Sequence, residues 1–372
     1  MAVAPVPWSG GCRFSREVPV PVPATAKRVQ APHDAHGHPL PGTRRRAAVG
    51  LLVGFAVFAA LLAVRILAPA EEGSAGLADT ARDFVSLSIS VVIESLPFVF
   101  LGIVLSIGVQ IWLPDGFLLR RLPASPVLRR PILSLLGMLL PVCECGNVPL
   151  ARGLIVRGLT VSESMTFLFA APILNPITII TTQQAFGWDN GILISRIAGG
   201  FLIANLIGWI YSRHPRPEVL LTSRFQEECS LENHAGQAAG KVGRSVQLFV
   251  RETGAMMPAL FIGAGIAGLI QVGVPRDVLV SVGTSPVWSV AALMVLAFVV
   301  AVCSNVDAFF ILSFGATFMP GSIVAFLVFG PMIDVKMLAL LRTTFTAKTL
   351  LQLTVVVALC SAALGLAVNY VL

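Results

Sequence analysis

Long apolar runs separated by shorter polar stretches dominate this chain. Such runs can be placed near 47–68, 82–112, 131–156, 161–182, 191–211, 245–272, 287–315, 319–341 and 349–371. The first of them, AAVGLLVGFAVFAALLAVRIL, already reaches the roughly 20 apolar residues that span a bilayer. The pattern therefore predicts an all-α polytopic membrane protein with about 8–9 membrane elements.

Two of the apolar runs are interrupted by polar and helix-breaking residues. The first interruption reads PVCECGNVP at 141–149, and the second reads CSNVD at 303–307. Hydrocarbon penalises polar groups, and non-helical backbone at membrane depth is tolerated only against protein or water. We therefore predict broken helices at these places. The residues expected to break helices are Pro141, Gly146, Pro149, Pro172, Pro176 and Pro331.

Three blocks of sequence recur in the same order at a spacing of about 160 residues. The paired blocks are 97–114 with 258–275, 142–148 with 302–308, and 167–175 with 326–334. The second pair brings Cys143 onto Cys303. Because the order is kept and the spacing drifts slowly, we predict two structural repeats, 82–211 and 245–372. The polar stretch 212–244 links them.

Basic loops predict how the chain is oriented, because cytoplasmic loops carry an excess of Lys and Arg. RRR at 44–46, four arginines in 119–130 and the basic linker 212–244 are all expected in the cytoplasm. All three face the same side if 131–156 enters the membrane and returns, and 287–315 then does the same from the other side. This topology predicts two inverted repeats with re-entrant hairpins and seven full crossings. Nine simple crossings stay the alternative.

The N-terminal region differs from the rest of the chain. Residues 1–43 lack apolar periodicity and predict a disordered cytoplasmic tail. Residues 44–70 predict an extra transmembrane helix that is not cleaved, because a signal peptide would start earlier. The expected location is the cell (inner or plasma) membrane, multi-pass, with a cytoplasmic N-terminus.

Composition narrows the function further. The 372 residues are 56% hydrophobic and only 12% charged, against about one-quarter charged in soluble domains. The net charge of +7 therefore reports loop orientation, not nucleic-acid binding. The sequence contains no nucleotide-binding loop, Ser-His-Asp set or His-rich metal site that we can identify. We expect no enzymatic activity, no cofactor and no resident metal. The expected partners are a small solute and the lipid bilayer. Whether the protein forms a homo-oligomer is left open.

Thiols are the first candidate chemistry at the interruptions. Cys143 and Cys145 lie two positions apart, and in extended or turned backbone their side chains face the same way. Two adjacent thiols form a soft-ligand pair suited to thiophilic metals or metalloids. The repeat relation brings Cys303 toward the same region. We predict that Cys143, Cys145 and Cys303 bind solute, although each could also serve as a small buried hydrophobe.

Ionisable and amide side chains are the second candidate chemistry. Glu144 and Asp307 sit at the two interruptions, and an ionisable group at bilayer depth suggests a proton site. Asn175 and Asp334 are paired positions of the next helix and are candidates for solute binding or for hydrogen bonds to freed backbone. Glu94 is interpreted as an interfacial or helix-pairing carboxylate.

Three basic side chains lie near these positions, and two of them, Arg152 and Arg157, could attract an anion. Lys336 follows Asp334 by two positions, so on a helix the two would point apart. Arg152 and Arg157 flank the returning arm of the first hairpin and are expected to snorkel to the membrane boundary.

Four motifs in this chain resemble a known family. PVCECGNVP and APILNP (within 141–179), CSNVDAFF (303–310) and GPMIDVK (330–336) are similar to the signature of the ArsP-like predicted permeases. Glu144 stands where such permeases commonly have Ser. The best-known members export trivalent organoarsenicals, so the resemblance implies recognition of such compounds through thiols.

These features together predict a secondary, proton-coupled efflux permease for a thiophilic solute, with trivalent organoarsenicals as the best candidate. Its site would combine the three cysteines with Glu144 and Asp307. A permease for another soft metal or sulfur-containing solute is the first alternative. A membrane oxidoreductase cycling Cys143 and Cys145 between dithiol and disulfide is the second, and a non-transporting membrane scaffold is the third.

Overall fold

The structure is a computed structural model, and it describes most of the chain after the N-terminal region. The described residues are 77–114, 122–123, 125–139, 142–188, 190–234, 240–273, 286–315 and 318–371. The predicted tail (1–43), the predicted extra helix (44–70) and Pro141 lie outside the described residues.

Helices make up the described part of the chain, which contains no named strand and one isolated β-bridge, Leu221–Phe345. The α-helices are α2 Leu77–Ile107, α4 Pro126–Leu136, α5 Glu144–Val156, α6 Val161–Leu174, α7 Pro176–Phe186, α8 Ile192–Ser212, α9 Ser223–His234, α10 Lys241–Gly273, α12 Pro286–Val300, α13 Asp307–Leu312, α14 Pro320–Met332, α15 Val335–Leu341 and α16 Ala347–Val371. A π-helical turn, η1 Gly108–Trp112, extends α2, and two short 3₁₀ turns, η2 Gly137–Leu139 and η3 Pro217–Leu220, complete the set. The predicted all-α class is confirmed.

Six helical spans are long and apolar enough to cross a membrane, by length and composition. They are Ala81–Trp112, Val161–Phe186, Ile192–Ser212, Lys241–Val272, Pro320–Leu341 and Ala347–Val371. The predicted polytopic membrane fold is confirmed within the described residues. The one remaining predicted crossing, 47–68, lies outside the described residues.

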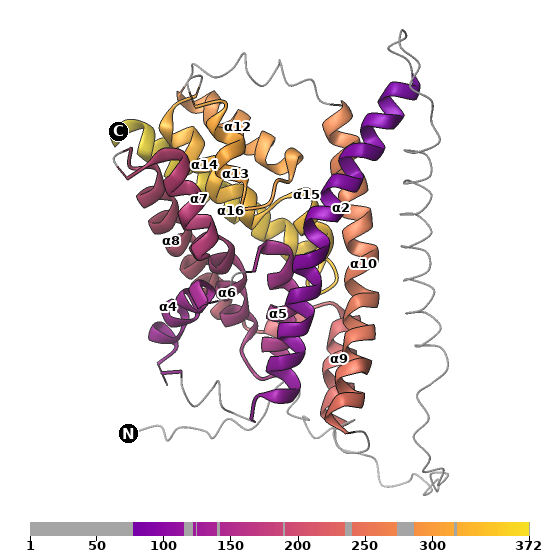
Figure 1. The fold of residues 1–372 in the computed structure, drawn as a ribbon. Coiled ribbons are helices and arrows are strands. Elements are labelled where there is room, and N and C mark those ends of the chain that lie inside the picture. The colour runs from indigo at the N-terminus through magenta and orange to yellow at the C-terminus, as the bar shows by residue number, and fades with distance from the viewer. Residues whose placement is uncertain are drawn as a thin grey trace, which may run out of the picture.

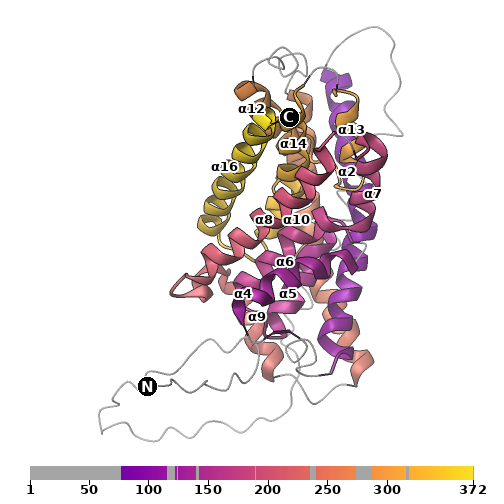
Figure 2. The same cartoon turned by 90° about the vertical axis from the view of Figure 1, so that its left-hand side faces the viewer.

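The two interrupted runs are each divided into two shorter helices. Residues 131–156 fall into α4, η2 and α5, and 287–315 fall into α12 and α13. The described residues directly before α5 (142–143) and between α12 and α13 (301–306) are not helical. Figures 1 and 2 show α4 and α5 in one half of the molecule and α12 and α13 in the opposite half. Re-entrant hairpins entering from opposite sides would have this arrangement, but the inverted relation of the two repeats stays a prediction.

Two of the membrane spans are also broken, each near its middle. Pro172 and Pro331 lie in the last turn of α6 and α14, which end at Leu174 and Met332. Asn175 and Asp334 then cap the following helices, α7 and α15, because each side chain accepts a backbone N–H from the first turn. Pro176 occupies the first position of α7, where a missing N–H costs nothing.

Gly146 and Pro149 do not break a helix, which corrects the sequence prediction, because both lie within α5. Gly146 instead allows close packing: a Cβ there would meet the Phe98 carbonyl oxygen of α2 at 2.4 Å. In turn, a Cβ at Gly102 would meet the Gly146 carbonyl oxygen at 2.1 Å. The backbones of α2 and α5 are therefore in direct contact, and Ser106 of α2 donates to the Pro149 carbonyl at 2.7 Å.

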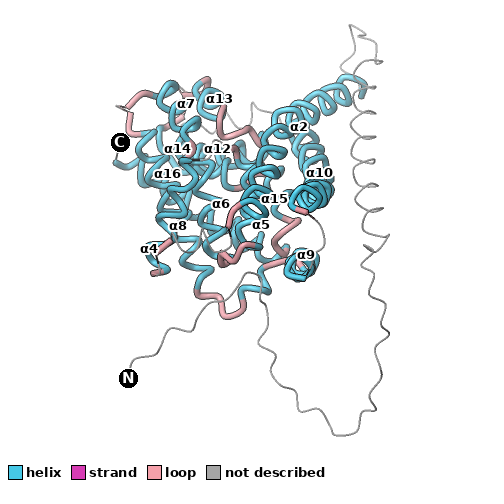
Figure 3. Tube along the Cα trace, turned by 60° about the horizontal axis from the view of Figure 1, so that its bottom comes forward, coloured by secondary structure: helices cyan, strands magenta, loops and turns pink. Residues whose placement is uncertain are grey.

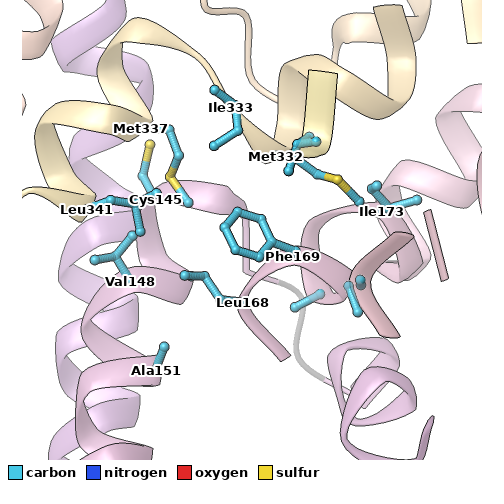
Figure 4. Packing of buried hydrophobic residues seen from close by; sticks show 14 of the residues in the cluster. Cys145, Val148, Ala151, Leu168, Phe169, Ile173, Met332, Ile333, Met337 and Leu341 are labelled. Carbon is cyan, nitrogen blue, oxygen red and sulfur yellow. The ribbon is translucent and has the colours of Figure 1, made fainter. Parts of the chain in front are cut away.

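The broken span α14–α15 runs through the centre of the molecule. Its apolar window is 89% buried, whereas that of α16 is 28% buried and faces outward. In the tube view of Figure 3, α15 lies beside α5, α2 and α10. Apolar side chains of α5, α6 and α15 pack around Cys145, with Val148, Phe169 and Met337 among them (Figure 4). The fold thus brings the start of α5 and the start of α15 together in the core.

Candidate solute site at the two helix breaks

The start of α5 carries the first group of candidate ligands. Cys143 is the residue before the helix and has extended backbone (φ −73°, ψ 176°), while Glu144 and Cys145 form the first turn. Only Cys143 is therefore extended, although both cysteines were expected to be in extended or turned backbone. The ligand atoms of Cys143, Glu144 and Cys145 nevertheless all lie within 4.8 Å of one another.

The second break joins this group, although it lies about 160 residues further along the chain. The thiol of Cys143 interacts with the side chains of both Cys145 and Cys303. Cys303 Sγ lies 3.9 Å from Glu144 Oε2. Ser304 donates to the same oxygen from its hydroxyl at 2.8 Å and from its backbone N–H at 3.3 Å. The two breaks therefore form one cluster of three thiols around one carboxylate.

A buried lysine completes the cluster, and its placement corrects the sequence prediction. Lys336 Nζ lies 3.1 Å from Glu144 Oε1 and 3.9 Å from Asp334 Oδ2. The prediction that Lys336 and Asp334 point apart is wrong because Asp334 precedes α15 with extended backbone, so helical spacing does not apply between them. Glu94 of α2 also lies near enough to Lys336 and to the second break to interact with them electrostatically.

The cluster is shielded from solvent in this conformation. Cys143, Cys145 and Cys303 are at most 3% exposed, and so are Glu144 and Lys336. Charged groups at such depth are costly unless they are paired, and a Lys–Glu pair meets that requirement. A solute can reach the cluster only if the packing around it rearranges.

Asp307, the other predicted proton-coupling residue, is engaged elsewhere. Arg196 of α8 binds its carboxylate with two hydrogen bonds, at 3.0 and 2.6 Å, and also donates to Thr182 at 2.7 Å. Both charged side chains are at most 2% exposed. Asp307 thus joins α13 to α8 through a buried ion pair, and its predicted role in proton coupling stays a prediction.

Asn175 connects the break between α6 and α7 to the first interruption, directly before α5. Its side-chain amide donates to the Val142 carbonyl at 3.0 Å, and its carbonyl oxygen accepts from the Ile177 N–H at 2.9 Å. These bonds satisfy backbone groups that the helix breaks leave free. These bonds favour a positioning role for Asn175, and its part in solute binding stays a prediction.

Two buried side chains near the cluster carry polar atoms that have no hydrogen-bond partner among the described residues. Neither side-chain amide atom of Asn147, one turn into α5 and 0% exposed, has a partner. Asp334 uses one carboxylate oxygen to cap α15, whereas its Oδ2 accepts no hydrogen bond. Buried polar atoms are almost always satisfied, so Asn147 and Asp334 Oδ2 are candidates for contact with a bound solute or water.

Lys336, Ser304 and Asn147 were not predicted as site residues from the sequence. A lysine in the middle of an apolar span is costly and could have identified Lys336. Nothing in a single sequence separates Ser304 or Asn147 from ordinary polar residues near a helix break.

Arg152 forms a second charged cluster at the other end of α5, roughly 12 Å from Glu144 along the helix. It binds Glu228 at 2.6 Å and Glu252 at 3.0 Å, and it lies over the Phe225 ring. The prediction that Arg152 snorkels to the boundary is wrong, because its side chain is only 2% exposed. A cavity of about 150 Å³ adjoins it, lined by Arg152, Thr222, Arg224, Glu228, Ala255, Arg342 and Thr343.

The fold and this interior site define a multi-pass membrane protein with thiol and charged side chains buried in its core. The family model ArsP_1, described as "Predicted permease", matches residues 80–370. The chain therefore belongs to this predicted permease family, as its motifs suggested.

Individual relatives agree with this assignment. "UPF0718 protein YcgR" of Bacillus subtilis is 34% identical over 263 residues, which cover 71% of this chain and 89% of that protein. The "Putative two-component membrane permease complex subunit" of Streptococcus mutans is 30% identical over 272 residues, covering 72% and 88%. "UPF0718 protein YraQ" of Escherichia coli is 29% identical over 119 residues, covering 31% and 33%. No solved structure matches this chain.

Proposed function

We propose that this permease carries a thiophilic small solute, with trivalent organoarsenicals as the preferred class, by secondary, proton-coupled efflux. One observation carries the proposal: sulfurs from two distant helix breaks meet around Glu144 in the buried centre of the bundle. Three thiols that do not form disulfides are a donor set for a soft metal or metalloid. A carboxylate buried beside them is costly, and an ionisable group at bilayer depth is by default a candidate for function.

The chemistry of a monosubstituted trivalent arsenical fits this donor set. Such a compound carries two exchangeable hydroxyl groups, and two thiols can replace them. Each As–O bond breaks as an As–S bond forms, and each thiol proton leaves with a hydroxyl as water. Two water molecules reverse the exchange on release, returning a proton to each sulfur. Glu144 Oε2, 3.9 Å from Cys303 Sγ, is placed to carry a proton between sulfur and hydroxyl.

Access from alternate sides would require the ends of the site to open in turn. Arg152 joins α5 to α9 and α10 at one end, and Arg196 joins α8 to α13 toward the other. Each ion cluster connects the first half of the chain to the second. In secondary transporters with discontinuous helices, rocking of one half against the other exposes a central site. We extend that behaviour to this chain and place the α9 end in the cytoplasm, from the basic residues of 212–244.

A transport assay tests the proposal. Inverted membrane vesicles containing the chain should accumulate trivalent methylarsenic when a proton gradient is imposed, and a protonophore should abolish the accumulation. Cys145→Ser should reduce it by about 100-fold, whereas Cys360→Ser is the matched control because Cys360 lies in α16, away from the cluster. Undiminished transport by Cys145→Ser would remove the sulfur site.

A soft metal ion is the second candidate solute, because the donor atoms of Cys143, Glu144 and Cys145 are close enough to share an ion. The Lys336 ammonium at 3.1 Å from Glu144 counts against it, because a cation would have to displace that charge. The same vesicles supplied with monovalent copper would distinguish the two: copper accumulation without methylarsenic accumulation would favour the metal.

A further inference from the structure

We propose that the cavity beside Arg152 binds a small oxyanion such as inorganic phosphate, and that the bound ion ties the linker to the second half of the chain. The cavity has a volume of about 150 Å³. It lies at the α9 end of the molecule, roughly 12 Å from Glu144 along α5. The proposal goes beyond transport of a thiophilic solute, because it concerns a different ligand at a different place.

The charge of the cavity lining favours an anion. Three guanidinium groups line it, from Arg152, Arg224 and Arg342, and Glu228 supplies the single lining carboxylate. Glu228 uses one oxygen for Arg152 at 2.6 Å and the other for Arg224 at 3.4 Å, so its charge is already offset. Positive groups stay in excess even after Glu252, which binds Arg152 from outside the lining. A concave site lined mainly by one sign of charge concentrates ions of the opposite sign.

Two of the three arginines keep hydrogen-bond donors for a ligand. Arg342 donates from Nη1 to the Phe345 carbonyl at 3.2 Å and forms no ion pair with any described residue. Arg224 contacts Glu228 through Nε, which leaves its terminal nitrogens available. Arg152, in contrast, donates to protein groups from all three of its nitrogens, so it supplies charge to the site. Guanidinium forks match the geometry of phosphate and carboxylate oxygens.

The size and lining of the cavity restrict the ligand further. Pockets for drug-sized molecules have volumes of roughly 300–1,000 Å³, so a cavity of about 150 Å³ suits only a small ion. The hydroxyls of Thr222 and Thr343 also line it, but both donate to backbone carbonyls, at 3.3 and 2.7 Å. The arginines are therefore the donors that a ligand would meet. Free phosphate and the phosphate of an anionic lipid headgroup share this chemistry.

An ion in this cavity would join segments that are far apart in the sequence. Arg224 lies in α9 of the linker, whereas Arg342 directly follows α15 in the second half of the chain. One backbone bond already joins these segments, because the Thr222 N–H donates to the Thr344 carbonyl at 2.9 Å. An oxyanion between the two arginines would add charge-assisted hydrogen bonds to this junction. A ligand that binds only one conformation stabilises it, so the ion would hold α9 in its docked position.

Direct binding of phosphate tests the proposal. Radiolabelled phosphate would be dialysed to equilibrium against the purified full chain in detergent, with chloride used to keep the ionic strength constant. We expect saturable binding to the wild type and a dissociation constant about tenfold higher in Arg342→Gln, because charge-assisted hydrogen bonds are lost. Lys348→Gln is the matched control, since Lys348 is an exposed cation a little further along the chain that does not line the cavity. Its dissociation constant should stay within about twofold, because salt screens exposed charges.

The position of the linker gives a second readout. Cys229 of α9 is 0% exposed, so a maleimide can reach its thiol only when α9 moves away. Phosphate at about ten times its dissociation constant should slow this alkylation by about tenfold, because it binds only the docked form. Mass spectrometry of peptides locates the label, and Cys360 in α16 is the internal control, whose alkylation should not change.

A lipid headgroup is the other source of the phosphate, and native mass spectrometry distinguishes it. Phosphatidylglycerol that stays bound to the wild type and to Lys348→Gln, but not to Arg342→Gln, would assign the oxyanion site to lipid.

Three results would overturn the proposal. Absence of both phosphate and lipid binding would remove the site, and equal weakening in Arg342→Gln and Lys348→Gln would reduce it to unspecific attraction. Unchanged alkylation of Cys229 under saturating phosphate would reject the tie between the ion and the linker. None of these results depends on methylarsenic transport.

Discussion

The two helix breaks that meet in the core differ in what they contribute. The first supplies two sulfurs and a carboxylate from the start of α5, whereas the second supplies one sulfur and the hydrogen bonds of Ser304. The positive charge comes from neither break, but from Lys336 on α15. Two segments that align with each other in sequence thus contribute different numbers and kinds of ligand atoms to one site. We interpret the first break as the main solute ligand and the second as the element that orients it.

The ends of the molecule differ in a related way. Arg152 and its two carboxylate partners adjoin a cavity of about 150 Å³, whereas Arg196 and Asp307 form a bidentate pair that is at most 2% exposed. The second cluster is the more completely desolvated of the two. We therefore expect the α9 end to open more readily from the conformation described.

The largest expected effect comes from breaking the more deeply buried ion pair. Arg196→Gln should lower the free energy of unfolding by about 3–5 kcal/mol, because it leaves Asp307 buried without its cation. Arg224→Gln is the control, since the Arg224 side chain is 74% exposed and its pair with Glu228 should contribute under about 1 kcal/mol. Thermal unfolding in detergent would measure both. Equal effects would contradict the contrast between buried and exposed pairs.

Next in size is the contrast between the two breaks. Cys145→Ser should reduce methylarsenic transport by about 100-fold, because a hydroxyl is a poor ligand for a soft metalloid. Cys303→Ser should reduce it by only about tenfold if the second break orients the first. Initial transport rates in vesicles would measure the ratio, with protein levels matched. A larger loss for Cys303→Ser would reverse the assignment of the two breaks.

A smaller effect is expected where α2 and α5 touch. Gly146→Ala should lower stability by about 1–3 kcal/mol, since the added methyl would overlap the Phe98 carbonyl at 2.4 Å. Gly108→Ala is the control, because a Cβ there meets nothing within 4 Å. Unfolding temperatures of the two variants would check this. No difference between them would contradict direct contact of the two backbones.

The smallest expected effect concerns Asn147. If its free amide contacts solute, Asn147→Ala should raise the half-saturating solute concentration by about threefold to tenfold, with the maximal rate kept. Asn147→Asp and the wild type, measured together, would separate loss of the amide from a change of volume. An unchanged half-saturating concentration in Asn147→Ala would exclude Asn147 from the binding surface.

Much of this organisation follows from the sequence alone. CECGN and CSNVD interrupt apolar runs so abruptly that both breaks could be located, and the six described spans coincide with predicted crossings. The pairing of Asn175 with Asp334 also anticipated two residues with the same capping role. Local polarity and proline positions are enough for such inferences, because polar side chains and unpaired backbone groups both cost free energy in the bilayer core.

The remaining features depend on tertiary contacts that a single sequence does not contain. Arg152 was expected at the membrane boundary, yet it is buried in ion pairs. Its partners, Glu228 and Glu252, lie 76 and 100 residues away, so these pairs could not be predicted from the local sequence. Gly146 was expected to break a helix, yet its role is set by the approach of α2. Lys336 was judged by helical spacing, but the break at Asp334 moves it into the site.

Direct proximity of the two breaks is the central claim, and cross-linking measures it. A variant keeping only Cys143 and Cys303 would be oxidised in membranes and then cleaved at a protease site inserted in the linker 212–244. We predict that the two halves stay joined without reductant and separate with it, whereas a variant keeping only Cys143 and Cys360 separates in both cases. Separation of the Cys143/Cys303 halves after oxidation would contradict the shared site.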